Sequence, residues 1–155
     1  MEVITIYTDG ACSGNPGIGS WSAILLYKEH KKILSGSFRL TTNNRMELIA
    51  VIEALKAIKN KSLPVVIYSD SQYVVKGINN HLTKWKSNNF SNIKNPDLWI
   101  ELYQQLQQFN NIQIQWIKGH SYNSYNNLAD NIAKQQLLTN NHSIDFNYEN
   151  NINNN

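Results

Sequence analysis

The spacing of hydrophobic and polar positions changes several times along the chain, and each spacing predicts a different element. Short apolar runs rich in β-branched and aromatic residues are typical of strands, whereas apolar residues three and four positions apart are typical of helices. The first pattern predicts strands over residues 2–7, 21–27, 32–40, 65–68 and 112–117. The second predicts helices over residues 44–63, 71–79, 96–106 and 128–137.

The order of these elements predicts the fold class and the extent of the domain. Three early strands followed by alternating helices and strands indicate an α/β fold, a mixed sheet with helices packed on it. Between residues 81 and 94 the hydrophobic period is lost, which predicts a protruding loop. Beyond Thr139 asparagine dominates, so we expect one domain over residues 1–139 and a disordered tail over 140–155.

Charge and cysteine content narrow the classes of partner and compartment. All 14 Lys and Arg residues lie within residues 1–139 together with nine of the 11 Asp and Glu residues, giving this part a charge of +5. A basic body favours a polyanionic partner. No leader and no apolar run of about 18 residues is apparent, which predicts a soluble cytoplasmic protein without membrane contact. The single Cys12 excludes an internal disulfide and a zinc site built from several thiolates.

Four carboxylates occupy positions that suggest a shared site. Asp9 and Asp70 follow apolar strands, and Glu47 and Asp130 lie early in predicted helices. Each has a structural explanation when taken singly: Asp9 in a turn, Glu47 in a capping box three residues after Asn44, Asp70 as a helix cap, and Asp130 on a solvated face. Gathered at the carboxyl end of a sheet, however, they would repel one another. Two Mg²⁺ ions would compensate that charge and accept oxygen ligands.

Several separate stretches of the chain match, in order, the motifs of one enzyme family. The chain resembles bacterial type 1 ribonuclease H at residues 8–17 (TDGACSGNPG), 41–48 (TTNNRMEL), 69–74 (SDSQYV), 118–120 (KGH) and 129–130 (AD). The resemblance implies a ribonuclease H-like sheet of five strands, three antiparallel and then two parallel, flanked by helices. It also implies a monomeric endonuclease without an organic cofactor. Such an enzyme hydrolyses the RNA strand of RNA–DNA hybrids with two Mg²⁺ ions, or Mn²⁺ as a substitute, and leaves 5′-phosphate and 3′-hydroxyl ends.

The same resemblance implies roles for individual residues. Asp9, Glu47, Asp70 and Asp130 would be the catalytic acids that hold the metal ions, and His120 would assist proton transfer or product release. Residues expected to bind the RNA strand are Gly10, Cys12, Gly14, Asn15, Asn43, Asn44 and Gln72. Residues expected to bind the DNA strand are Thr42, Lys84, Trp85, Lys86 and Asn95. Turn glycines, a buried thiol, helix caps and a solvated loop histidine are the structural alternatives for these positions.

The chain departs from the family pattern in residues 81–94, which match a basic protrusion that holds the DNA strand. The segment is several residues shorter here, and its cations are Lys84, Lys86 and Lys94. Fewer phosphate contacts predict weaker hybrid binding and a shallower dependence on salt.

Two other functions remain open on this sequence. A hybrid-binding module that has lost its chemistry is disfavoured because all four acids and His120 are present. A nuclease of integrase or DNA-exonuclease type is disfavoured by Asn43, Asn44 and Gln72, the expected readers of an RNA strand.

Overall fold

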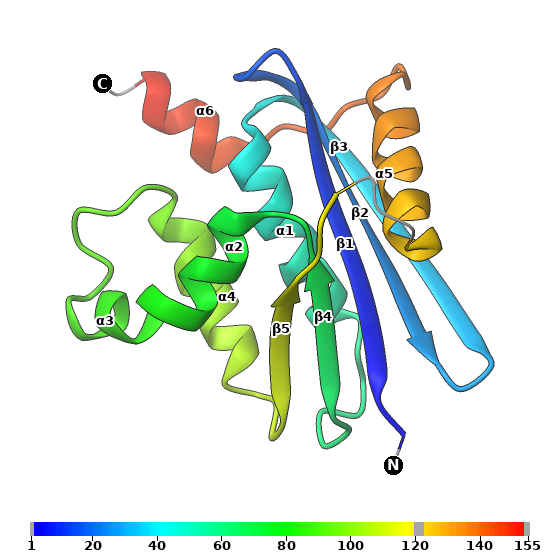
Figure 1. Ribbon diagram of the computed structural model, residues 1–155. Coiled ribbons are helices and arrows are strands. Elements are labelled where there is room, and N and C mark those ends of the chain that lie inside the picture. Colours follow the sequence, from blue (N-terminus) through cyan, green and yellow to red (C-terminus); the bar gives the residue numbers. More distant parts are fainter. Residues whose placement is uncertain (1, 120–122, 154–155) are drawn as a thin grey trace.

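A five-stranded mixed sheet forms the centre of the computed structural model, which describes residues 2–119 and 123–153 (Figure 1). The strands lie in the order β3-β2-β1-β4-β5. β1 pairs antiparallel with β2, and β2 with β3, while β4 is parallel to β1 and β5 is parallel to β4. The sheet predicted from the sequence is therefore confirmed. The strands are β1 (Ile4–Ser13), β2 (Gly17–Tyr27), β3 (His30–Thr41), β4 (Val65–Ser69) and β5 (Ile112–Trp116).

Helices cover both faces of the sheet. α1 packs against β1 and β2 on one face and contacts α4, whereas α5 packs against β1, β2 and β3 on the other (Figure 1). A short π-helical turn, η1, joins α2 to α3. The helical segments are α1 (Asn43–Lys56), α2 (Gln72–Lys76), η1 (Gly77–His81), α3 (Leu82–Ser87), α4 (Pro96–Leu106), α5 (Ser124–Leu137) and α6 (Phe146–Asn153). None of the described helices is long and apolar enough to cross a membrane.

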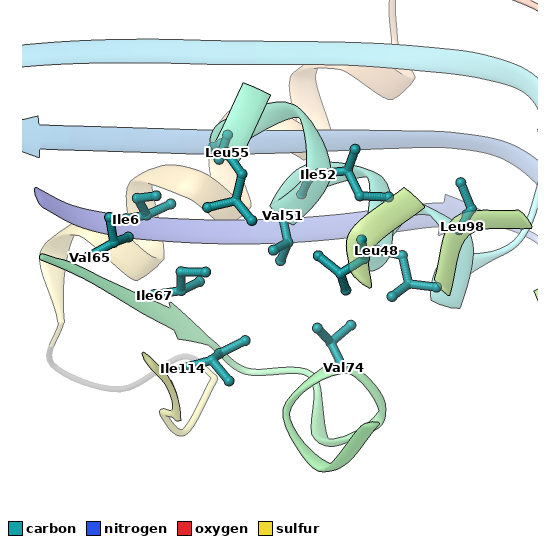
Figure 2. Packing of buried hydrophobic residues seen from close by; sticks show 14 of the residues in the cluster. Ile6, Leu48, Val51, Ile52, Leu55, Val65, Ile67, Val74, Leu98 and Ile114 are labelled. Atoms are coloured by element: carbon teal, nitrogen blue, oxygen red, sulfur yellow. The ribbon is translucent and has the colours of Figure 1, made fainter. Parts of the chain in front are cut away.

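The two faces of the sheet are packed differently. On the α1 face, branched side chains from strands and helices fill one apolar cluster, in which Ile6 and Ile67 lie near Val51 and Leu55 of α1 (Figure 2). On the α5 face the buried β2 residues include serines, and the Ser22 hydroxyl donates to the Ala129 carbonyl at 2.6 Å. Because successive side chains of a strand point to opposite faces of the sheet, the face toward α1 carries the large apolar core. The other face holds α5 through a smaller contact that includes hydrogen bonds.

Several elements differ from their sequence predictions. β2 begins at Gly17 rather than residue 21, α1 ends at Lys56 rather than residue 63, and α5 begins at Ser124 rather than residue 128. β1 continues past Asp9 to Ser13 because its backbone remains paired with β2 as far as Ser13 opposite Ile18. Residues 81–94, expected as a loop, contain α3. Leu82 is buried and the Trp85 ring packs on Trp99 with ring centroids 4.9 Å apart, so local burial gives this segment a defined structure.

The disordered tail expected from residue 140 is wrong for the described residues up to 153. Ser143 forms a bridge to Phe38 on the edge of the sheet, and α6 follows. Asp145 is buried and accepts a hydrogen bond from Arg45 Nε at 2.8 Å. A long-range ion pair therefore fixes a segment whose own composition does not favour order.

Candidate active site

Three of the four candidate acids meet at one end of the sheet. Asp9 lies in β1, Asp70 directly follows β4, and Glu47 lies in the second turn of α1. One carboxylate oxygen from each lies within 4.8 Å of the others. The parallel pairing of β1 with β4 places Thr8 opposite Ser69, so the residues that follow, Asp9 and Asp70, are neighbours.

The position of Glu47 depends on Gly10. The Gly10 N–H donates to Glu47 Oε1 at 3.0 Å. A Cβ at residue 10 would lie 2.7 Å from the backbone nitrogen of Glu47, so only glycine lets α1 approach β1 this closely. The Glu47 side chain is buried, and among the described residues its Oε2 atom has no hydrogen-bond partner. Such a buried acceptor is a suitable ligand atom for a cation.

Other residues cap helices α1 and α2, so helix capping does not explain the positions of Glu47 and Asp70. Thr42 caps α1 by accepting from Arg45 N at 3.3 Å, and Ser71 caps α2 by accepting from Val74 N at 3.2 Å. Glu47 and Asp70 are therefore not the caps of these helices.

Crowding of the carboxylates makes their charges unfavourable in the metal-free protein. Burial, followed by the charges of Asp70 and Asp130, raises the pKa of Asp9 to about 8. Burial, followed by the charges of Asp9 and Asp70, raises the pKa of Glu47 well above its ordinary range. Perturbed carboxylates of this kind are typical of functional sites, and a divalent cation would restore their ionised forms.

Asp130 approaches the cluster from the opposite face. It lies in α5, its hydrogen bond with Asp9 contributes to the raised pKa of that residue, and Lys134 Nζ lies 2.9 Å from its Oδ2. It is not one of the three acids whose oxygens lie within 4.8 Å. The structure thus brings Asp130 beside Asp9, while three acids form the tight group.

The segment that leads to His120 passes beside Asp70. Ile117 N donates to Ser69 O at 2.9 Å, and Trp116 Nε1 donates to the Asp70 carbonyl at 3.2 Å. A Cβ on Gly119 would lie 2.9 Å from Asp70 Oδ2. His120 itself lies outside the described residues.

Comparison with known proteins identifies the family of the chain that carries this acidic cluster. The family model for RNase H matches residues 1–138. The chain is 51% identical over 148 residues to Ribonuclease H of Thermoanaerobacter sp. (strain X514), covering 90% of this chain and 93% of that protein. The chain belongs to the ribonuclease H family.

Two solved structures have the same fold over most of this chain. LC9-RNase H1, a type 1 RNase H with the type 2 active-site motif, superposes with a TM-score of 0.78 at 28% identity, over 87% of this chain and 72% of that one. The foamy viral protease-reverse transcriptase in complex with RNA/DNA hybrid gives a TM-score of 0.75 at 27% identity. That match covers 88% of this chain and 20% of the viral one.

Except for Gln72 at the start of α2, the residues expected to bind RNA lie around the turn between β1 and β2 and at the start of α1. Asn15 Oδ1 accepts from Asn43 N at 3.1 Å, and the Cys12 thiol donates to Gly14 O at 2.9 Å. The first bond joins the turn to the start of α1 in this ribonuclease H domain, and the second lies within the turn segment. The Asn44 and Gln72 side chains are exposed.

The residues expected to bind DNA separate into two places. Thr42 and Asn95 line one cavity, and Asn95 uses its side chain to contact Arg45 and Tyr73 rather than to cap α4. Lys84 and Lys86 lie exposed on α3.

Sequence reasoning missed several residues around these sites. Tyr73, whose hydroxyl accepts from Asn95 Nδ2 and Trp99 Nε1, was not among the expected site residues. Tyr148, Asn151 and Ile152 line the Thr42 cavity, and no hydrophobic period marked them in the asparagine-rich sequence.

Proposed function

We propose that this chain hydrolyses the RNA strand of RNA–DNA hybrids with two Mg²⁺ ions, leaving 5′-phosphate and 3′-hydroxyl ends. The convergence of Asp9, Glu47 and Asp70 on a ribonuclease H domain carries the proposal. Asp130, beside Asp9, completes the set of acids. Mn²⁺ is a plausible substitute because it also accepts carboxylate oxygens.

The donor set fits a hard divalent cation. Carboxylate oxygens are the ligands that Mg²⁺ prefers, and the unpartnered Glu47 Oε2 supplies one that the described part of the protein does not satisfy. When bound, the ions would supply Lewis-acid stabilisation of the attacking and leaving oxygens of the phosphodiester. The Gly10 N–H orients Glu47, and the β1–β4 pairing orients Asp9 and Asp70. Pre-positioned acids reduce the reorganisation that the reaction requires.

Selection of a hybrid would come from the polar groups beside the acids. A 2′-hydroxyl both donates and accepts hydrogen bonds, which distinguishes RNA from DNA. Gly10, Cys12, Gly14 and the turn amide of Asn15 are proposed to approach the RNA strand, together with Asn43, Asn44 and Gln72. The DNA strand is assigned to Thr42, Asn95, Lys84, Trp85 and Lys86. His120, which follows Gly119 beside Asp70, is proposed to move a proton or assist product release.

The proposed enzyme is a cytoplasmic monomer whose catalytic domain spans residues 1–139 and uses no organic cofactor. A single cysteine, Cys12, suits a reducing compartment. Size-exclusion chromatography with light scattering would test the monomer, since a stable dimer would have twice the chain mass.

Cleavage of defined substrates tests the activity. An end-labelled RNA–DNA hybrid, duplex RNA and duplex DNA are incubated with the full chain, with and without Mg²⁺, alongside Asp70→Asn and Glu29→Gln. Glu29 is exposed and lies outside the cluster, so its variant makes an equal change in charge elsewhere. We expect metal-dependent cleavage of the hybrid's RNA strand alone, lost in Asp70→Asn and retained in Glu29→Gln. Binding without cleavage in Mg²⁺ or Mn²⁺ would refute the enzyme, and cleavage of duplex DNA would refute the hybrid specificity.

A further inference from the structure

The C-terminal segment after the family match has a fixed place on the domain. The RNase H match ends at residue 138, and α6 begins at Phe146. Between them, Ser143 N donates to Ser37 O at 3.0 Å and Arg39 N donates to Ser143 O at 2.9 Å. Arg39 also bonds Glu149 of α6 through two nitrogens. Figure 1 shows α6 lying beside the start of α1, near the end of the sheet that carries the acids.

A buried network holds α6 against α1. The Asp145 carboxylate accepts from Arg45 Nε at 2.8 Å and from Thr41 Oγ1 at 2.7 Å, and it also accepts from Tyr148 N at 3.3 Å. The last bond caps the start of α6. Arg45 also bonds Asp97, and burial disfavours the Arg45 charge, but the hydrogen bonds to Asp97 and Asp145 raise its pKa above its ordinary range. Arg45 therefore stays charged and anchors α6.

Because α6 is anchored here, it forms one wall of a cavity of about 440 Å³. The lining residues from the rest of the domain are Asn15, Thr42, Asn44, Arg45, Lys94 and Asn95. From α6 the lining residues are Tyr148, Asn151 and Ile152.

Hydroxyl, amide and ammonium donors surround this cavity and suit a phosphodiester. Two carboxylates already engage the Arg45 charge, so Lys94, which is exposed, is the lining cation best placed to meet an anion. The amide of Asn151 adds a donor from the α6 side. Tyr148 adds an aromatic ring whose centroid lies 5.9 Å from the guanidinium carbon of Arg45.

We propose that α6 is part of the nucleic-acid-binding surface and that Asn151 contacts the strand whose phosphate enters the cavity beside Thr42 and Asn95. The inference rests on the proposed function, in which that strand is DNA. It extends the binding surface beyond the family domain, to a segment that the sequence pattern assigned to a disordered tail. It also gives a compensating contact to a protein whose protrusion carries few cations.

A change of charge at residue 151 tests this inference. Asn151→Asp and Asn151→Lys are compared with Asn150→Asp and Asn150→Lys, since Asn150 is exposed on the same helix but does not line the cavity. Hybrid Kd is measured in EDTA, and KM and kcat are measured in Mg²⁺. We expect Kd and KM to differ about tenfold between the Asn151→Asp and Asn151→Lys variants, weaker for the acid, with kcat within about twofold. The pair at residue 150 should differ by about twofold or less, because Asn150 is exposed outside the cavity, where solvent and salt screen its charge more strongly.

Equal effects at residues 150 and 151, or tighter binding by Asn151→Asp, would overturn the inference. Circular dichroism of each variant shows whether α6 and the fold are retained. The binding titration needs no cleavage, so an inactive wild type would refute the proposed activity while the comparison at residue 151 still decides the role of α6.

Discussion

Removing one charge from the acidic cluster should stabilise the metal-free protein at alkaline pH. The relevant change is Asp9→Asn, which keeps the shape of a buried side chain and removes its charge. The pKa of Asp9 is raised to about 8 in the folded state from an ordinary value of 3.8. Between these values the folded protein binds more protons than the unfolded chain, so the free energy of unfolding decreases as pH rises. At 1.36 kcal/mol per pKa unit, the full shift corresponds to roughly 6 kcal/mol.

Asp9→Asn recovers only part of this loss of unfolding free energy, because the amide cannot reproduce every contact of the carboxyl group. A gain of about 1–3 kcal/mol in the free energy of unfolding would raise Tm by about 3–10 °C for a chain of this size. Thermal unfolding is followed by circular dichroism in EDTA at pH 5.5 and 8.5, with Glu29→Gln as the control for loss of a surface charge. We expect Asp9→Asn to be more stable than wild type at pH 8.5. At pH 5.5 it should be equal to wild type or less stable, because roughly 3 kcal/mol of the loss in wild type occurs between these two pH values.

Added Mg²⁺ should reduce the advantage of the variant, because the cation neutralises the intact cluster and selectively stabilises the wild type. The reasoning would be refuted if wild type and Asp9→Asn showed the same Tm at pH 8.5. It would also be refuted if both wild type and the Glu29→Gln control became more stable in EDTA as the pH rose from 5.5 to 8.5.

Three further predictions concern the anchor of α6, the α3 cations and the loop histidine. Asp145→Ala should lower the free energy of unfolding by about 3–5 kcal/mol in urea titrations, because it leaves the Arg45 charge buried beside one fewer carboxylate; a loss below about 1 kcal/mol would contradict a buried ion pair. Replacing Lys84 and Lys86 with Ala should reduce the slope of log Kd against log salt by up to about two units, and an unchanged slope would remove α3 from the DNA contacts. His120→Ala should lower turnover by about 10- to 10³-fold without abolishing it, and unchanged single-turnover and steady-state rates would exclude the residue from the mechanism.

Local patterns were sufficient for most of the elements. The Pro96–Leu106 helix has the bounds that its apolar period and Asn-Pro start indicate, and the Ile112–Trp116 strand ends one residue before the predicted 117. Side-chain spacing and helix-start chemistry act over a few residues, so local sequence reports them. β1 is longer than its apolar run. Its end beyond Asp9 depends on pairing with β2, which no local period reports.

The candidate acids were also identifiable from sequence, through their positions after strands and early in the predicted helices, and through the resemblance. Whether each acid served a cap or the cluster could not be decided there. Thr42 and Ser71 both had capping chemistry, yet so did Asn44 and Asp70, and only the folded backbone shows that the hydroxyls make the bonds. The capping choice rests on distances between atoms, which residue types alone do not fix.

The sequence by itself determined the order of strands and helices, the basic body and the four acids that the fold could gather. The tertiary structure decided that residues 140–153 of the asparagine-rich end are ordered. Asp145 is 100 residues from Arg45 in the chain, and the burial of this pair depends on β3, α1 and α6 all being in place. An ion pair of that separation leaves no periodic signal in the sequence around either partner. The contribution of α6 to the cavity beside Thr42 follows from the same contact, because the partner that holds the segment lies in a distant part of the chain.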